Sequence, residues 1–207
     1  MNIMDNKNEF KPYIPADKIV PEFTVTSIVI GIILAVVFGA ANAYLGLLVG
    51  MTISASIPAA VISMGIIRVI LRRDSILENN IVQTIGSAGE SLAAGAIFTL
   101  PALFLWAEEG KIEFPSMITI FFIALFGGLL GVCFMVPLRQ ALIVEEHGTL
   151  PFPEGTACAE VLLAGEEGGS KAGTVFTGLG IAAVYKFIAD GLKLFPSEIG
   201  YAFKGYA

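Results

Sequence analysis

Glu90 is the residue of this chain whose type and position most directly suggest chemistry. It is the sole charged residue between Asn79 and Ala107, a stretch long enough to cross a bilayer as a helix. At about 1.5 Å per residue, Glu90 lies roughly 16 Å along the helix from Asn79, near the middle of a ~30 Å hydrocarbon core. A carboxylate at that depth is costly unless it faces protein, water or a partner, so Glu90 is a candidate for a substrate or proton pathway.

The helical periodicity around Glu90 indicates which way this side chain points. Gln83, Gly86 and Ser87 fall on the same side of the helix as Glu90, whereas the opposite side carries mostly bulky residues such as Leu92. A membrane helix packs closely against another helix on a face of small residues, so we expect Glu90 to point into a bundle. A buried structural carboxylate is one interpretation. We favour the other, in which Glu90 takes up a proton near neutral pH and couples its movement to transport.

The composition places these residues in a membrane protein. Of the 207 residues, 56% are hydrophobic and only 14% are charged, and the mean hydropathy is +0.81. Soluble domains carry about 25% charged residues. The net charge of −6 and the absence of a basic patch argue against a nucleic-acid partner. We therefore predict an all-α, polytopic transmembrane helix bundle whose main partner is the lipid bilayer.

Catalytic and metal-binding motifs are missing from the sequence. It has no H-E-x-x-H pattern and no recognisable pairing of a nucleophile with a base, so we predict no enzymatic activity, no cofactor and no metal site. Two alternatives to transport stay open, namely a membrane-embedded enzyme that uses Glu90 and a membrane subunit that does not itself transport. Uptake that depends on an ion gradient would separate transport from both.

The hydrophobic stretches define the expected spans. A polar tail of residues 1–22 precedes a transmembrane domain of residues 23–207. The stretch from Phe23 to Ile67 has no charged residue and is too long for one helix, so we place a tight turn near Asn42, where polar residues cluster. The predicted spans are about residues 24–42, 47–70, 79–105, 115–137 and 172–194.

Pro58 should kink or break the second of these spans, because proline lacks the amide N–H that a helix interior needs. The nearby Ser54 and Ser56 could then bond the backbone groups that the break leaves free. The span is either a kinked packing helix or a discontinuous helix that lines a substrate path. In the second case, the candidate pathway residues are Asn42, Ser54, Ser56, Gln83 and Glu90.

Basic residues indicate the orientation in the membrane. Arg72 and Arg73 end the second span, and the lysines of the N-terminal tail lie on the same side if two spans intervene. The positive-inside rule makes that side cytoplasmic. The acidic loop Glu108–Glu113 then lies outside, and the fourth span returns inward to Arg139. We predict a multi-pass protein of the cell membrane with a cytoplasmic N-terminus.

A short helix is predicted over about residues 154–164. Pro151 and Pro153 force an extended approach, and Glu154 falls in the first helical turn, where the helix dipole favours an acid. The helix is too short to span, so it either lies on the inner surface or enters the membrane as a re-entrant half-helix. If re-entrant, its free N–H groups could meet a substrate carboxylate, unless Glu154 already caps them.

Two segments of the chain are weakly alike. Ser87–Gly95 and Ala157–Gly165 share glutamate, leucine, alanine and glycine at equivalent positions, and the alignment pairs Glu90 with Glu160. Such internal similarity fits a transporter in which corresponding broken segments form the site. Glu154 and Glu160 therefore join the candidate residues of the substrate or proton pathway.

Three blocks of the sequence resemble the oligopeptide transporter family. They are Gly39–Ile62, Asn79–Leu103 and Leu150–Leu162, which have the order and spacing of the family over about the first 160 residues. The branch that they are most similar to is the prokaryotic one that resembles the plant yellow-stripe metal–chelate transporters.

This resemblance implies a secondary symporter driven by protons. Its substrates would be short peptides or metal complexes of small, amino-acid-derived chelators, and its coupling ion would be the proton. Family members are several times longer than this chain, so the sequence looks like an N-terminal fragment whose partner is the remainder of the transporter chain. The resemblance implies no role for any particular residue.

Overall fold

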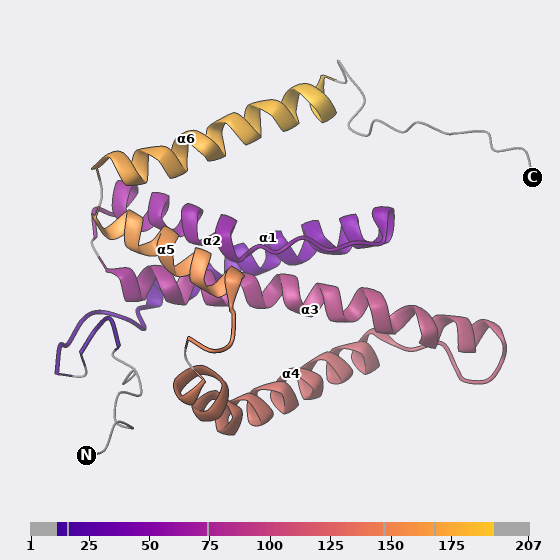
Figure 1. Ribbon diagram of the computed structural model, residues 1–207. Coiled ribbons are helices and arrows are strands. Elements are labelled where there is room, and N and C mark those ends of the chain that lie inside the picture. Colours follow the sequence, from indigo (N-terminus) through magenta and orange to yellow (C-terminus); the bar gives the residue numbers. More distant parts are fainter. Residues whose placement is uncertain (1–11, 16, 74, 147, 168, 193–207) are drawn as a thin grey trace, which may run out of the picture.

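The protein folds into helices only, over the residues that the computed structural model describes, which are 12–192 without 16, 74, 147 and 168 (Figure 1). This confirms the predicted all-α class. The helices are α1 (Val25–Val49), α2 (Ser56–Met64), α3 (Ile76–Glu108), α4 (Met117–Arg139), α5 (Pro153–Glu167) and α6 (Gly169–Lys186). Turns of π-helix extend three of them, η1 (Gly65–Ile70) after α2, η2 (Gln140–Glu145) after α4 and η3 (Phe187–Gly191) after α6.

Helices α1 and α3 run side by side in the same direction (Figure 1). Near their starts, the Thr24 hydroxyl donates to the Glu78 carboxylate at 2.6 Å. Near the end of α1, Gly46 faces the side chain of Ile97. Between these points the backbones of Gly89 and Ala35 meet so closely that a Cβ on Gly89 would overlap the Ala35 carbonyl group. Small residues therefore permit this contact, as expected for membrane helices.

Helix α1 continues through Asn42, where we expected a turn. The Asn42 side chain is satisfied inside the helix, because its amide donates to the Phe38 carbonyl at 3.2 Å. The helix ends at Gly50, which adopts a left-handed φ of +72° and donates its N–H to the Gly46 carbonyl at 2.9 Å. Glycine reaches that conformation without the strain that a Cβ causes, so the chain reverses there and not at the polar cluster.

The second predicted span is discontinuous. Residues 51–55, here called the connecting segment, are not helical, and α2 begins only at Ser56. Pro58 lies in the first turn of α2, where a missing N–H costs no intrahelical hydrogen bond. The proline thus belongs to the start of a short helix and not to a kink within a long one.

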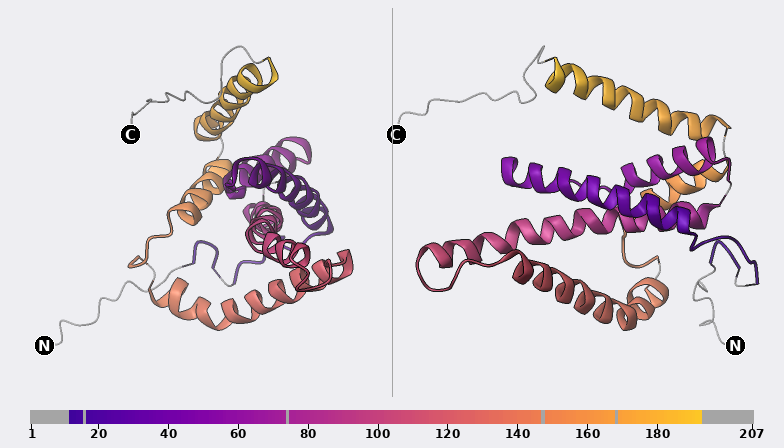
Figure 2. Two further views of the ribbon diagram at one scale, coloured as in Figure 1. Left: turned by 90° about the vertical axis from the view of Figure 1, so that its right-hand side faces the viewer. Right: turned by 180° about the vertical axis from the view of Figure 1, so that it is seen from behind.

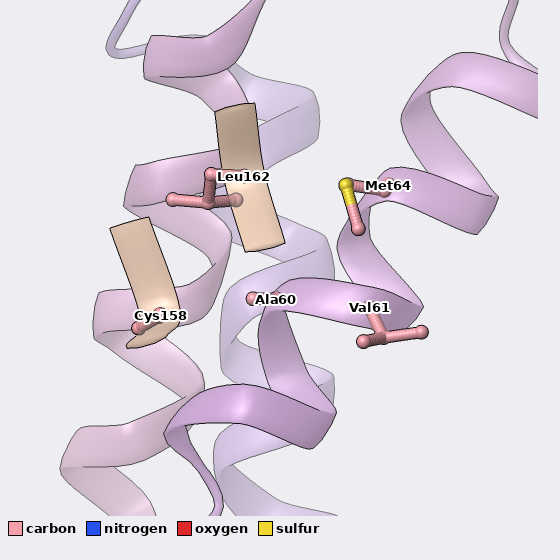
Figure 3. Packing of buried hydrophobic residues seen from close by; sticks show 5 residues of the cluster. All are labelled: Ala60, Val61, Met64, Cys158 and Leu162. Carbon is pink, nitrogen blue, oxygen red and sulfur yellow. The ribbon is translucent and has the colours of Figure 1, made fainter. Parts of the chain in front are cut away.

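Helices α2 and α5 pack against each other as a pair of short helices (Figure 3). Ala60, Val61 and Met64 from α2 form a buried cluster with Cys158 and Leu162 from α5. A second cluster joins α2 and η1 to α1 and α3 through Leu34, Ala59, Ile67 and Val82. Both short helices therefore lie along the first half of α3.

Helices α4 and α6 lie on opposite sides of these central helices (Figure 2). No residue of α4 is buried within the described part of the chain. Three helical stretches are long and apolar enough to cross a membrane, namely Val25–Val49, Ile76–Glu108 and Met117–Glu145. The last predicted span, 172–194, corresponds to α6 and η3, and its final two residues lie outside the described range.

Candidate functional site

The connecting segment is held by two polar side chains from the long helices. The N–H of Ile53 donates to the Asn42 side-chain oxygen at 2.8 Å, and the N–H of Ala55 donates to the Glu90 carboxylate at 3.3 Å. Asn42 and Ala55 are buried, and Glu90 is half-buried. These hydrogen bonds satisfy a non-helical backbone between helices, where unpaired N–H groups would be costly.

The next residues connect this backbone to α3 and α5. The Ser56 hydroxyl lies 2.9 Å from the Ser87 hydroxyl, one turn before Glu90 on α3. The Ser54 hydroxyl donates to the Glu154 carboxylate in the first turn of α5. The Ser54 hydroxyl oxygen also accepts a hydrogen bond from the Ser56 N–H at 3.4 Å. Ser54, Ala55 and Ser56 therefore link the carboxylates of Glu90 and Glu154, which belong to different helices.

An open groove of about 410 Å³ lies beside this link, between α2, α3 and α5. Its polar lining consists of Ser56, Asn80, Gln83, Glu154 and Cys158, and its remaining lining of Gly155, Ala159 and Leu162. Ligand pockets typically measure roughly 300–1,000 Å³, so the groove has the volume of a small-molecule site.

The model of a family described as OPT oligopeptide transporter protein matches residues 22–201. The chain belongs to the oligopeptide transporter family. It is 42% identical over 153 residues to a protein of Haemophilus influenzae named "Putative oligopeptide transporter". No solved structure matches the chain.

The alignment with this relative covers unequal shares of the two proteins. It includes 73% of the present chain but 23% of the relative, so the chain spans about a quarter of the relative's length. The structure therefore corresponds to part of a protein of the relative's length.

Most of the residues that the sequence predicts for the pathway meet around the connecting segment. Asn42 and Glu90 accept hydrogen bonds from its backbone N–H groups. Ser54 belongs to the segment, Ser56 follows it directly, and the Glu154 carboxylate accepts a hydrogen bond from Ser54. Gln83 lines the adjacent groove. Glu160 is separate, because its side chain is exposed and does not line the groove. The alignment with Glu90 therefore does not place Glu160 at an equivalent position in space.

The structure adds two polar residues to this region that the sequence pattern did not indicate. Ser87 bonds Ser56, and Asn80 lines the groove one turn before Gln83. Helical periodicity placed Ser87 on the Glu90 face but gave no reason to pair it with Ser56.

A second polar cluster lies where α1 and α3 begin. The Glu78 carboxylate is buried and accepts hydrogen bonds from Thr24 at 2.6 Å and from the Arg73 guanidinium at 3.4 Å. Ser75 caps α3 by accepting the Glu78 N–H, and its hydroxyl donates to the Pro21 carbonyl at 2.5 Å. The buried Glu78 carboxylate and the Ser75 hydroxyl both have partners within the protein, so the cluster fixes the start of the bundle.

The chemistry available around the connecting segment is hydrogen bonding. The carboxylates of Glu90 and Glu154 accept hydrogen bonds, and the neighbouring hydroxyl and amide groups can donate or accept them. Within the described residues, no three side chains of histidine, cysteine, aspartate or glutamate gather closely enough to hold a metal ion.

Proposed function

We propose that this chain forms part of a proton-coupled transporter that carries oligopeptides across the cell membrane. The observation that supports this most is the position of Glu90, near the middle of α3, where its carboxylate holds the N–H of Ala55 at the start of α2. A titratable group at mid-membrane, bonded to broken backbone beside a groove, is the arrangement that secondary transporters use.

The contacts around Glu90 supply a route for coupling protons to substrate. Hydrogen bonds to an ionised acceptor are roughly twice as strong as those between neutral groups, so protonation of Glu90 weakens its hold on Ala55. Ala55 lies between Ser54, which bonds Glu154, and Ser56, which lines the groove. A change at Glu90 therefore reaches the groove through three consecutive residues.

The proposed orientation has the N-terminus in the cytoplasm. Arg72 and Arg73 lie at the same end of the bundle as the start of α1, whereas the acidic loop from Glu108 to Glu113 lies at the other end of α3 (Figure 1). The positive-inside rule assigns the arginine end to the cytoplasm. On this orientation, α5 runs from the interior of the bundle toward the cytoplasm.

Peptides are the first substrate class to test, and metal chelates the second. The name of the Haemophilus influenzae relative specifies oligopeptides. Metal chelates of amino-acid-derived ligands remain a candidate through the resemblance to yellow-stripe transporters. The acid that lines the groove, Glu154, disfavours chelates with a net negative charge.

The decisive experiment compares Glu90→Gln with a matched control in the full-length transporter. Both wild type and variant would be reconstituted in proteoliposomes, and uptake of a labelled tripeptide would be followed with and without an inward proton gradient. We expect Glu90→Gln to abolish gradient-driven accumulation and to keep the wild-type elution profile in size exclusion. Glu160→Gln, the same change at an exposed site of α5, should accumulate the peptide like wild type.

Three results would contradict the proposal. Unchanged proton dependence in Glu90→Gln would remove its coupling role and leave a structural carboxylate. Uptake by the wild type that ignores every gradient would argue against secondary transport. Absence of uptake together with turnover of a substrate would favour a membrane-embedded enzyme.

A further inference from the structure

We propose that the groove between α2, α3 and α5 binds the amino-terminal end of the peptide, with Glu154 as the partner of the substrate ammonium group. This inference rests on the proposed function, because it names the part of an oligopeptide that the groove recognises. It concerns a different residue from the proton-coupling proposal, and binding can be measured without transport. The charge of the groove, its remaining polar groups and its apolar wall support it separately.

The charge of the groove selects a cation. Among the described residues, Glu154 is the one acidic residue of its lining, and none of those that line it is lysine, arginine or histidine. Within the same residues, the Glu154 carboxylate accepts one hydrogen bond, from Ser54, at Oε1. A carboxylate has about four lone-pair sites, so acceptor capacity remains for the three donors of an ammonium group.

The helix N-termini beside the groove would by themselves favour an anion, but neighbouring groups largely compensate their partial positive charge. An α-helix carries roughly half a positive charge at its N-terminus. At the start of α2, the N–H of Ala55 is bonded to Glu90, the N–H of Ser56 is bonded to Ser54, and Pro58 has none. At the start of α5, the full negative charge of Glu154 in the first turn exceeds the half charge of the helix. The sum favours a substrate ammonium over a substrate carboxylate.

The neutral polar groups of the groove match a peptide backbone. Asn80 and Gln83 are one turn apart on the same face of α3, and both line the groove. A carboxamide side chain offers donors and an acceptor together, as a peptide bond does, and it carries no charge that must be compensated. These two residues can therefore bond the first peptide unit after the ammonium group.

The rest of the lining explains how such a site could accept many side chains. Ala159 and Leu162 form the apolar wall, and Gly155 adds no side chain. None of the three can form a directional side-chain contact with a substrate residue. Recognition would then depend on the amino terminus and the backbone, and substrate side chains would be tolerated broadly.

The test measures binding by titration calorimetry on the full-length protein in nanodiscs, without any gradient. The probes are trialanine, N-acetyl-trialanine and trialanine amide. We expect acetylation, which removes the ammonium charge, to weaken binding about tenfold or more, since hydrogen bonds to charged groups are worth about 1.5–3 kcal/mol. Amidation of the carboxyl end should change binding less than threefold, because no group of the groove depends on that charge.

Variants test whether the preference for a free amino terminus arises in the groove. Glu154→Gln should bind trialanine and N-acetyl-trialanine equally, whereas Glu160→Gln on the same helix should retain the wild-type preference. Gln83→Leu should weaken binding of all three probes alike, because it removes a backbone contact and no charge. Wild-type elution in size exclusion would show that each variant is folded.

The outcomes separate this inference from the proposed function. Equal binding of acetylated and free trialanine by wild type would overturn the inference even if gradient-driven uptake is observed. Stronger loss on amidation than on acetylation would instead assign the groove to the peptide carboxylate, and no binding of any probe would also contradict it. Selective binding with no uptake would support the groove and contradict the transport proposal.

Discussion

Helices α1 and α4 are nearly equal in hydropathy and very different in their surroundings. An 18-residue window of Val25–Val49 has a mean hydropathy of 2.4 and one of Met117–Glu145 has 2.5, yet α1 contributes buried residues to the bundle and α4 contributes none within the described part of the chain. The polar network around the connecting segment lies wholly among α1, α2, α3 and α5. Hydropathy therefore identifies a span but does not indicate which spans surround a site.

The comparison of α1 with α4 also shows that a G-x-x-x-G motif alone does not indicate close helix packing. Gly46 packs against Ile97, but Gly50 serves as a left-handed helix cap and has open space around its Cα. In α4, Gly127 and Gly131 have no heavy atom within 4 Å of an added Cβ. A small residue produces close packing only where the partner helix presents a surface that can approach it.

The largest predicted effect is that of Gly89→Ala at the crossing of α1 and α3. Its Cβ would overlap the Ala35 carbonyl, and backbone atoms cannot move aside as a flexible side chain can. We expect a loss of about 3 kcal/mol or more in unfolding free energy, at the upper end of overpacking effects. Equilibrium unfolding of the full-length protein in mixed detergent measures it.

Gly128→Ala in α4 is the matched control for this change. Gly128 has open space around it, and alanine is the better helix former by about 1 kcal/mol, so this variant should be unchanged or slightly more stable. If Gly89→Ala were as stable as Gly128→Ala, the close crossing of α1 and α3 would be wrong.

A smaller effect is expected from the two helix caps. Thr24 caps α1 and also donates to the buried Glu78, whereas Ser116 caps α4 and bonds only Thr119 among the described residues. Thr24→Ala should cost about 2 kcal/mol, because it removes a cap and a donor to a buried carboxylate. Ser116→Ala should cost about 1 kcal/mol or less. Equal losses in the same unfolding assay would show that the Thr24–Glu78 contact adds nothing.

The sequence predicted the helical class and the residues of the candidate site better than the breaks between the helices. Glu90, Gln83 and Ser87 could be assigned to one face because a continuous helix has a fixed period. Asn42 lies at a predicted turn, Ser54 and Ser56 precede Pro58, and Glu154 falls at a predicted helix start. Polar residues at such breaks need partners inside a membrane protein, so type and position together indicate them.

The path between the helices could not be predicted, because it depends on tertiary contacts. Asn42 resembles a turn residue in sequence, but inside α1 it bonds Phe38 and the returning backbone at Ile53. The start of α2 at Ser56 is fixed by Glu90 and Ser87, which follow more than 30 positions later. No local pattern contains that information, and the same reason explains why the separation of Glu160 from the groove was missed.

The way in which α5 lies in the membrane can be tested by cysteine labelling. The expected effects are differences in labelling rate and not in stability. Single cysteines would be placed along residues 154–164 of a full-length protein in which Cys133 and Cys158 are serine, and treated with an impermeant thiol reagent from the cytoplasmic side. A helix lying flat on the surface would react along one whole face, from its first turn to its last. A re-entrant helix whose N-terminus lies beside α2 and the middle of α3 would not react along one whole face, because part of it packs against α2.

We expect position 162, which is buried against α2 although it borders the groove, to be protected, and positions 155 and 159, which line the groove and are exposed, to react. Excess trialanine should slow labelling at 155 and 159, because the groove is then occupied, and should leave position 160 unaffected. A cysteine at position 110 should react only from the outer side, since the loop after α3 lies at the opposite end from Arg72 and Arg73. Labelling of positions 155, 159 and 162 alike, unaffected by peptide, would show a surface helix, and the groove would then not lie on a path through the membrane.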